Sequence, residues 1–374
     1  MGRARSGGVR EGARGSGGVT RVTRVGTGGG RVTVLGAGII GLCVADELVR
    51  RGLEVLVLDP TPGQGASWAA AGMLSPAAES WYGETDLLET GRRSARLWPP
   101  LAARLGVEVH TRGTLLVGHD AGDLQGVERH AALLTAAGEA VHPLGRRELR
   151  SVEPGLGRVA GGVLLREEWA VDPRRAVAAL AARLGDVVVR RAGALAPLAE
   201  EARARGDVVV VATGATLPEP FGHLVRGVRG ETIRVRCDDP PVHVVRGLVR
   251  GRAVYLVPRA DGEVVVGATS GEHDGPPVAT VGGVAELLEP ARTLLPGLDR
   301  ATWLEVVARD RPGTADNRPL VGPTHLPGVL LAAGHFRHGV LLAPLTALVI
   351  ADHIEHGTGL SAWDPRRLDE RKTA

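Results

Sequence analysis

The chain has 374 residues, of which 44% are hydrophobic and 23% charged, a composition typical of soluble globular proteins. This length permits a large core and two or three domains. The formal net charge is +3, but residues 1–30 contain six arginines and one acidic residue. The rest of the chain is therefore close to neutral, which argues against nucleic acid as the main partner.

Residues 1–30 are rich in Gly, Ser and Arg and contain few large apolar residues, so we expect a disordered tail. A nucleic-acid-binding arm and a mis-assigned start are alternative interpretations. The segment lacks the apolar stretch of a signal peptide, so secretion is not indicated. Cys43 and Cys237 are far apart and show no metal-ligand spacing, which favours a reducing cytoplasm and no metal site. The apolar run at 340–351 contains Pro344 and is shorter than the roughly 20 residues of a membrane span, so no membrane partner is expected.

Residues 31–59 carry the pattern of a dinucleotide-binding unit. A short apolar strand at 32–35 leads into a G-x-G-x-x-G turn, a helix, and a second strand at 55–58. Such a turn brings backbone close to a pyrophosphate, and the N-terminus of the helix favours negative charge. Asp59 lies 18 residues after the last glycine, where a carboxylate binds an adenosine ribose. The pattern predicts a cofactor site that includes Gly36, Gly38, Gly41 and Asp59.

Three later segments extend this unit. Residues 66–76 are mostly small, so they either let a flat group lie against the backbone or form a tightly packed helix. The β-branched run at 207–214 predicts a central parallel strand that ends near the cofactor at Gly214. A strand at 329–333, a glycine-flanked turn and a helix at 340–354 predict a second site for a polar or anionic group.

The middle of the chain changes character. It alternates polar and apolar residues at 232–237, 253–257 and 263–267, which predicts an antiparallel sheet inserted into the first domain. A further strand is predicted at 114–117, and helices at 87–105, 127–137, 174–184 and 284–295, with Asp172 as an N-cap and Pro173 at the first helical position. We therefore predict an α/β fold with a discontinuous Rossmann-like cofactor domain (31–100, 152–220 and 309–366), a substrate domain (101–151 and 221–308) and a C-terminal tail at 367–374.

Six motifs are specific enough to compare with known families: G-A-G-I-I-G at 36–41, A-S-W-A-A-A-G-M-L at 66–74, Y-L-V-P-R at 255–259, V-V-V-G-A-T at 264–269, R-P-G-T-A-D at 311–316 and A-G-H-F-R-H-G-V-L-L-A-P at 333–344. Together they resemble the D-amino-acid oxidase family of FAD-dependent amine oxidases, and the middle ones are similar to its glycine oxidase branch. The resemblance extends from Arg31 to about Trp363.

The resemblance implies non-covalent FAD, because neither cysteine lies near the positions assigned to the flavin. It places along the cofactor Ile39, Ile40, Asp59, Pro60, Ala66, Ser67, Ala71, Gly72, Met73, Val171, His335, Phe336, Arg337, His338, Gly339, Val340 and Leu341. It also implies that Arg311 binds the substrate carboxylate, with Arg337 and Tyr255 nearby. A guanidinium can bind a carboxylate through two parallel hydrogen bonds, so arginine side chains suit the binding of an amino acid that is to be oxidised.

The activity implied is oxidation of glycine to glyoxylate, ammonia and H₂O₂ with O₂ as acceptor, with the imine intermediate handed to a thiazole synthase in thiamine synthesis. A homo-oligomer is expected. Sarcosine, a D-amino acid or proline are alternative substrates. Arg309 and Asp310 depart from the small and apolar residues usual in the family, and their charges either pair with each other or perturb the pocket. This departure would fit a flavin-binding protein that has lost turnover. Ser270 replaces a methionine of one branch, so a roomier or more polar pocket is expected.

Overall fold

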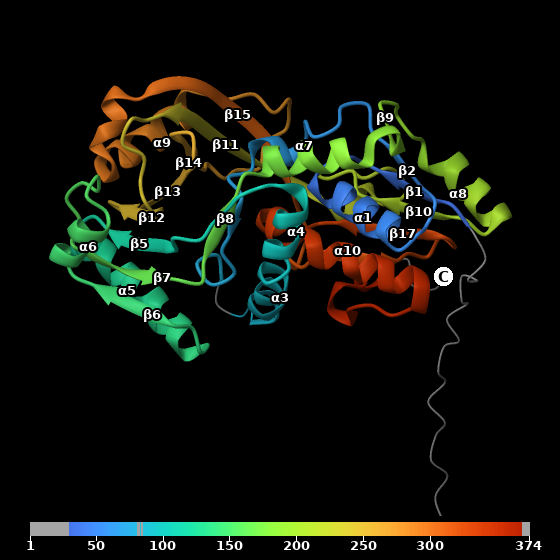
Figure 1. Ribbon diagram of the computed structural model, residues 1–374, viewed down its shortest axis with the longest axis horizontal. Helices are drawn as coiled ribbons and strands as arrows, with labels where there is room; N and C mark the ends of the chain where they lie inside the picture. The colour runs from blue at the N-terminus through green and yellow to red at the C-terminus, as the bar shows by residue number, and fades with distance from the viewer. Residues whose placement is uncertain (1–29, 81–82, 84, 369–374) are drawn as a thin grey trace, which may run out of the picture.

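The computed structural model describes residues 30–80, 83 and 85–368 (Figure 1). Nearly all of the predicted N-terminal tail, and residues 369–374 of the predicted C-terminal one, therefore lie outside the described residues. Two sheet units lie side by side in Figure 1, one with the helices α1, α7, α8 and α10 and the other with α5, α6 and α9. The α/β class and the inserted second sheet are confirmed.

The first sheet is the predicted Rossmann-like core. Its strand order is β16-β17-β10-β1-β2-β9, and every pair is parallel except β16 with β17. Continuous β-branched runs suit strands that are buried on both faces. The strands are β1 (Val32–Leu35), β2 (Val55–Leu58), β9 (Val188–Val189), β10 (Val208–Val211), β16 (Leu320–Pro323) and β17 (Val329–Ala333).

Helices cover both faces of this sheet. One face packs Val32, Val34 and Val210 against α1 (Ile39–Arg50), α7 (Pro173–Leu184) and α10 (Gly339–His356). The other face packs Leu35 and Val211 against α8 (Leu195–Arg205). The predicted cap of α7 is confirmed, because the Asp172 carboxylate accepts hydrogen bonds from the Arg174 and Arg175 backbone.

The second sheet has eight strands in the order β15-β11-β14-β13-β12-β5-β7-β6. We predicted it as antiparallel, but it is mixed because β5 pairs in parallel with β12. Its strands are β5 (Thr114–Gly118), β6 (Val141–Leu144), β7 (Gly161–Leu165), β11 (Arg226–Arg236), β12 (Val244–Val249), β13 (Arg252–Pro258), β14 (Glu263–Gly267) and β15 (Thr302–Gly313). The sequence did not predict the longest of them, β15.

Side-chain alternation divides this second sheet into two faces. On one face, Leu256, Val264 and Val266 pack against two helices, α9 (Val281–Leu294) and α6 (Arg146–Val152). Val257 and Val265 lie on the opposite face and pack with Ala71 of the cofactor unit. A small sheet of β3 (Met73–Leu74), β8 (Trp169–Val171) and β4 (Val109–His110) lies between the two units, and α5 (Ala121–Ala136) covers β5.

The predicted helix at 87–105 is two helices, α3 (Thr85–Ala95) and α4 (Trp98–Leu105). Pro99 and Pro100 occupy the first turn of α4, where proline is tolerated, but they could not continue α3 because they lack backbone N–H groups. The Trp98 indole donates to the carbonyl of Val340 at 3.0 Å, which ties α4 to the start of α10.

Helix α10 is longer than the apolar run at 340–351 from which we judged the segment too short to span a membrane. Together with the preceding turn (336–356) it is long and apolar enough, by composition, to cross a membrane. However, 67% of the 18-residue window that meets this test is buried inside the protein, and α10 packs beside α1 and α3. Burial in the core therefore accounts for its apolar composition.

The domain bounds stay a prediction. By strand pairing, β7 and the end of β15 belong to the second sheet, although we assigned residues 152–220 and 309–366 to the cofactor domain. Helix α4 packs on α7 of the cofactor unit, although we assigned residues 101–151, which include most of α4, to the substrate domain.

Candidate active site

The glycine turn places the N-terminus of α1 at the carboxyl end of the central strand β1. Gly36 has a positive φ of 104°, and a Cβ there would lie 2.3 Å from the carbonyl oxygen of Ala212. Gly41 allows α1 to pack closely against this turn, because a Cβ at this position would lie 2.0 Å from the carbonyl oxygen of Gly36. The first turn of α1 has no acidic residue and no side-chain cap at Gly38. This helix end therefore suits an anionic group.

Two side chains tie the neighbouring segments to this turn. The Asp59 carboxylate accepts from the backbone N–H groups of Ala37 and Thr61, both at 2.7 Å. An ionised carboxylate has about four acceptor sites, so capacity remains for a ligand hydroxyl. The Ser67 hydroxyl accepts from the Ile39 N–H at 3.0 Å and so joins α2 (Ala66–Ala69) to α1.

A cavity of about 360 Å³ begins at this turn and extends to the face of the second sheet. Ala69, Ala70, Ala71 and Gly72 line its middle, where small side chains leave room for a flat group. The Ala69 carbonyl accepts from Thr232 at 3.2 Å and that of Ala71 from Arg259 at 2.5 Å. A side chain of β11 and one from the residue directly after β13 thus hold this run in place.

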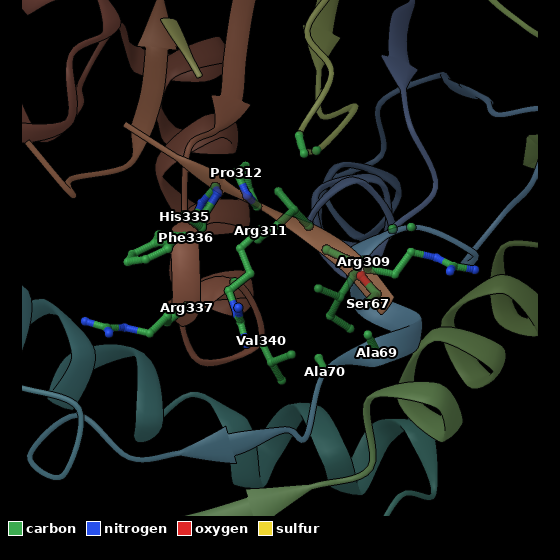
Figure 2. Close-up of a pocket in the computed structure, with 18 of the residues that line it drawn as sticks. Ser67, Ala69, Ala70, Arg309, Arg311, Pro312, His335, Phe336, Arg337 and Val340 are labelled. Atoms are coloured by element: carbon green, nitrogen blue, oxygen red, sulfur yellow. The ribbon is translucent and has the colours of Figure 1, made fainter. Parts of the chain in front are cut away.

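Arg311 lies at the far end of the cavity on β15 (Figure 2). Its guanidinium donates to the carbonyl oxygens of Thr269 at 3.2 Å and Arg229 at 3.4 Å. In the described part of the chain no carboxylate pairs with it. Figure 2 shows its side chain extending into the pocket. A cation without a protein anion in such a place can bind the carboxylate of a ligand.

Asp310 does not pair with Arg309, so the pairing alternative is wrong. Asp310 instead binds Arg229 across the strand pair through two contacts, at 2.5 and 3.2 Å. Arg309 donates to the carbonyl oxygens of Gln64 and Ala308, both at 2.8 Å. The Asp310 charge is therefore neutralised by Arg229 and leaves Arg311 available.

Tyr255 lines the same end of the cavity from β13. Burial raises the pKa of Tyr255 above its usual value, although the nearby Arg311 guanidinium opposes this. The phenol therefore stays protonated and can donate one hydrogen bond. His335 differs, because burial lowers its pKa to about 3 and its Nε2 lies 2.8 Å from the Thr346 hydroxyl. It is neutral at ordinary pH and is too weak a base to take a proton from a substrate amine.

Gly230 makes room for the Arg311 guanidinium. A Cβ at Gly230 would lie 2.2–2.4 Å from the guanidinium atoms, which are the movable end of a flexible chain. We expect Gly230→Ala to fold and keep its cofactor but to raise KM for the substrate about 10- to 100-fold, the worth of a displaced charged hydrogen bond. Gly227→Ala on the same strand is the control, because its Cβ would meet only Asp310 at 3.3 Å or more. Equal KM values in the two variants would contradict this role.

Two acidic side chains near the cavity were not predicted as site residues. Glu79 lines the cavity and contacts Arg246 of β12 and Arg337 of the turn before α10. Glu168 is buried below, and its Oε1 accepts from the Ala77 and Ala78 N–H groups at 2.6 and 3.2 Å. Neither has a local sequence signal, because their partners come from distant parts of the chain.

Burial raises the pKa of Glu168 to about 7, from an ordinary value of 4.5. Between these values the unfolded carboxyl loses its proton while the folded one keeps it, so this group lowers stability as pH rises from 4.5 through 7. Glutamine mimics the protonated carboxyl. We expect Glu168→Gln to match the wild type near pH 4.5 and to be more stable at pH 8 by about 1–3 kcal/mol, measured by urea unfolding. A stability difference that does not change with pH would contradict the expectation.

The cavity brings together most of the predicted site residues. Three predicted cofactor residues do not line it: Gly41 packs under the turn, Pro60 is exposed, and Val171 is buried with its N–H bonded to Gly72. Ser270 is exposed and does not line it either. The other predicted residues all line it: Gly36, Gly38, Ile39, Ile40, Asp59, Ala66, Ser67, Ala71, Gly72, Met73, Gly214, Tyr255, Arg311 and His335 to Leu341.

A family model described as FAD dependent oxidoreductase, or DAO, matches residues 31–353. The chain belongs to this family of FAD-dependent oxidoreductases.

Particular relatives narrow the class to amino-acid oxidases. The ThiO protein of Rhizobium etli is 37% identical over 326 residues, covering 85% of this chain and 94% of the relative. A glycine oxidase of Bacillus licheniformis is 31% identical, covering 91% and 97%. The crystal structure of glycine oxidase from Geobacillus kaustophilus superposes with a TM-score of 0.78 at 27% identity, covering 90% and 98%. The chain spans about half (52%) of a bifunctional ThiO/ThiG protein of Trichormus variabilis.

The residues present fit FAD. The N-terminus of α1, where Gly38 provides no side-chain cap, lies at one end of the cavity for the phosphates, and the small residues 69–72 also line the cavity. Cys43 and Cys237 do not line the cavity. The expected non-covalent attachment is compatible with this arrangement.

Proposed function

We propose that the protein catalyses the oxidative deamination of glycine: glycine, O₂ and water give glyoxylate, ammonia and H₂O₂. The observation that carries this proposal is the Arg311 guanidinium, which reaches the cavity without a carboxylate partner in the described part of the chain. Tyr255 lines the same cavity. The names of the relatives support glycine as the substrate.

The protein residues orient the substrate in this proposal. Arg311 binds the carboxylate, Tyr255 donates one further hydrogen bond, and together they fix the direction of the Cα–H bond. The residues that line the cavity from the glycine turn to the small segment at 69–72 would hold FAD, which would supply the two-electron oxidation of that bond. The apolar side chains of Met73, Val340 and Leu341 line the same cavity and limit water. No protein acid or base is required if glycine enters with a neutral amine.

The product also suggests a partner. In the bifunctional relatives a ThiO part is joined to ThiG, which supports transfer of the imine to a thiazole synthase in thiamine synthesis. Cytoplasmic location and a homo-oligomeric state stay predictions. No described feature favours sarcosine, a D-amino acid or proline over glycine as the substrate. Loss of turnover is not favoured either, because the Asp310 carboxylate is paired with Arg229.

An H₂O₂ assay of the purified holoenzyme with glycine, sarcosine, D-alanine and D-proline tests the proposal. We expect bound flavin absorbance and the highest kcat/KM with glycine. If another of these amines gave a higher kcat/KM, that amine and not glycine would be the preferred substrate. Bound flavin without turnover of any of them would refute the proposed activity.

A further inference from the structure

Arg309 is a cation in the wall of the cavity, and no carboxylate of the described residues forms an ion pair with it. It lies half-buried on β15, two residues before Arg311, and lines the same cavity. Its Nε donates to the carbonyl oxygen of Gln64 and its Nη1 to that of Ala308, both at 2.8 Å. Carbonyl oxygens accept hydrogen bonds but carry no net charge. The positive charge of Arg309 is therefore left for a ligand.

The loop after β2 places Arg309 at the glycine-turn end of the cavity. The Gly63 N–H donates to the carbonyl of Ala37 at 3.0 Å, so this loop lies on the glycine turn. Gly63 lines the cavity, and Gln64, to which Arg309 donates, is the next residue. Figure 2 shows the side chains of Arg309 and Arg311 pointing in different directions. Arg311 thus belongs to the substrate end of the cavity and Arg309 to the end at the N-terminus of α1.

The other charged side chains of the cavity have different roles. Arg311 lies at the far end, and Arg337 contacts Glu79. Asp310 is paired with Arg229 from the neighbouring strand and does not balance the charge of Arg309. Among the described arginines that line the cavity, Arg309 is thus the one placed beside the glycine turn.

We propose that Arg309 binds the phosphates of FAD and adds a full positive charge to the one that the N-terminus of α1 supplies. Each phosphate of FAD carries a negative charge, whereas a helix N-terminus offers N–H groups and only roughly half a positive charge. A guanidinium binds phosphate oxygens through parallel, charge-assisted hydrogen bonds. The inference goes beyond the proposed function, because it depends on FAD in this cavity and not on the choice of substrate.

The position of Arg309 makes this contact a property of this chain. Small and apolar residues are usual there in the family, so the common phosphate site is the helix N-terminus alone. The alternative is that Arg309 only fastens the loop after β2 to β15 through its bond to the Gln64 carbonyl. That alternative requires a hydrogen-bond donor at residue 309 but no charge.

Two substitutions separate the charge from the hydrogen bond. Lysine and glutamine can both donate to the Gln64 carbonyl, but only lysine is charged. We expect Arg309→Gln to raise the Kd of the apoprotein for FAD about 10- to 100-fold, the worth of one charged hydrogen bond, and Arg309→Lys to raise it much less. Flavin fluorescence titration measures each Kd. Equal Kd values for Arg309→Gln and the wild type, or equal losses in the two variants, would overturn the proposal.

Arg205→Gln is the matched control for the loss of one positive charge. Arg205 ends α8 on the surface, where it contacts Glu201, and it does not line the cavity. This variant should bind FAD as the wild type does. A loss as large as that of Arg309→Gln would show that net charge, and not the position of Arg309, determines the affinity, and would overturn the proposal.

The salt dependence of FAD binding tests the wild type without relying on a variant. Salt screens a partly exposed charge, so the wild-type Kd for FAD should rise as NaCl is added, and more steeply than that of Arg309→Gln. A wild-type Kd that salt leaves unchanged, or an apoprotein that binds no FAD, would overturn the proposal. If glycine is not oxidised, the proposed function fails, whereas these titrations still decide the role of Arg309.

Discussion

Arg311→Ala is expected to keep its fold and its FAD but to lose kcat/KM on glycine by about 10²- to 10³-fold. The guanidinium donates only to two carbonyl oxygens, so no buried carboxylate is left unpaired when it is removed. A charged hydrogen bond in a site that excludes water contributes about 1.5–3 kcal/mol, and a misplaced substrate loses further rate. KM should rise and kcat should fall together, because the same contact both binds glycine and fixes its orientation.

Arg311→Lys separates charge from geometry. Lysine keeps the positive charge but cannot donate two parallel hydrogen bonds, so we expect an activity between those of the wild type and Arg311→Ala. Steady-state kinetics and the ratio of flavin to protein absorbance are measured for all three. A kcat/KM for Arg311→Ala equal to that of the wild type would remove Arg311 from substrate binding.

Gly41→Ala is expected to cause the largest loss of FAD. Its Cβ would lie 2.0 Å from the carbonyl oxygen of Gly36 and 3.4 Å from Ala212, and the first of these is backbone that cannot move alone. Helix α1 would have to shift away from the glycine turn, which would carry its N-terminus away from the phosphates. We expect the protein to be purified with little flavin and a Kd for FAD at least about 100-fold higher, as when two charged hydrogen bonds are lost.

Gly282→Ala in α9 is the matched control. Nothing lies within 4 Å of a Cβ at this position, and alanine favours a helix over glycine. This variant should bind FAD as the wild type does and should be slightly more stable. Equal FAD affinity in Gly41→Ala and Gly282→Ala, measured by fluorescence titration of the apoproteins, would contradict close packing at Gly41 as a condition for binding.

The cofactor unit was predictable because its signals are local. The glycine turn, the apolar strands and Asp59 follow one another in sequence, and the helix after residue 339 was predicted from a glycine-flanked turn. Arg311 and Tyr255 were different, because an arginine before proline and a tyrosine in a strand have common structural explanations. Only the family resemblance pointed to them, and the cavity now brings both together.

The failures have long-range causes. Strand β15 was missed because Glu305, Asp310 and Arg311 interrupt its apolar alternation. Two of these are neutralised from outside the strand, Asp310 by Arg229 of β11 and Glu305 by Arg174 of α7. Glu79 looks like an ordinary acidic residue in a loop, and its importance depends on Arg246 and Arg337, which lie 167 and 258 residues further along. Pairing at such distances leaves no mark in a local pattern.

Anaerobic titration of the holoenzyme with glycine tests most directly whether the cavity joins a bound FAD to the Arg311 clamp. The flavin absorbance of the wild type should disappear with a saturable dependence on glycine, and Arg311→Ala should need far more glycine for the same change. A wild type whose flavin absorbance glycine leaves unchanged, or an Arg311→Ala variant that titrates like the wild type, would contradict the account.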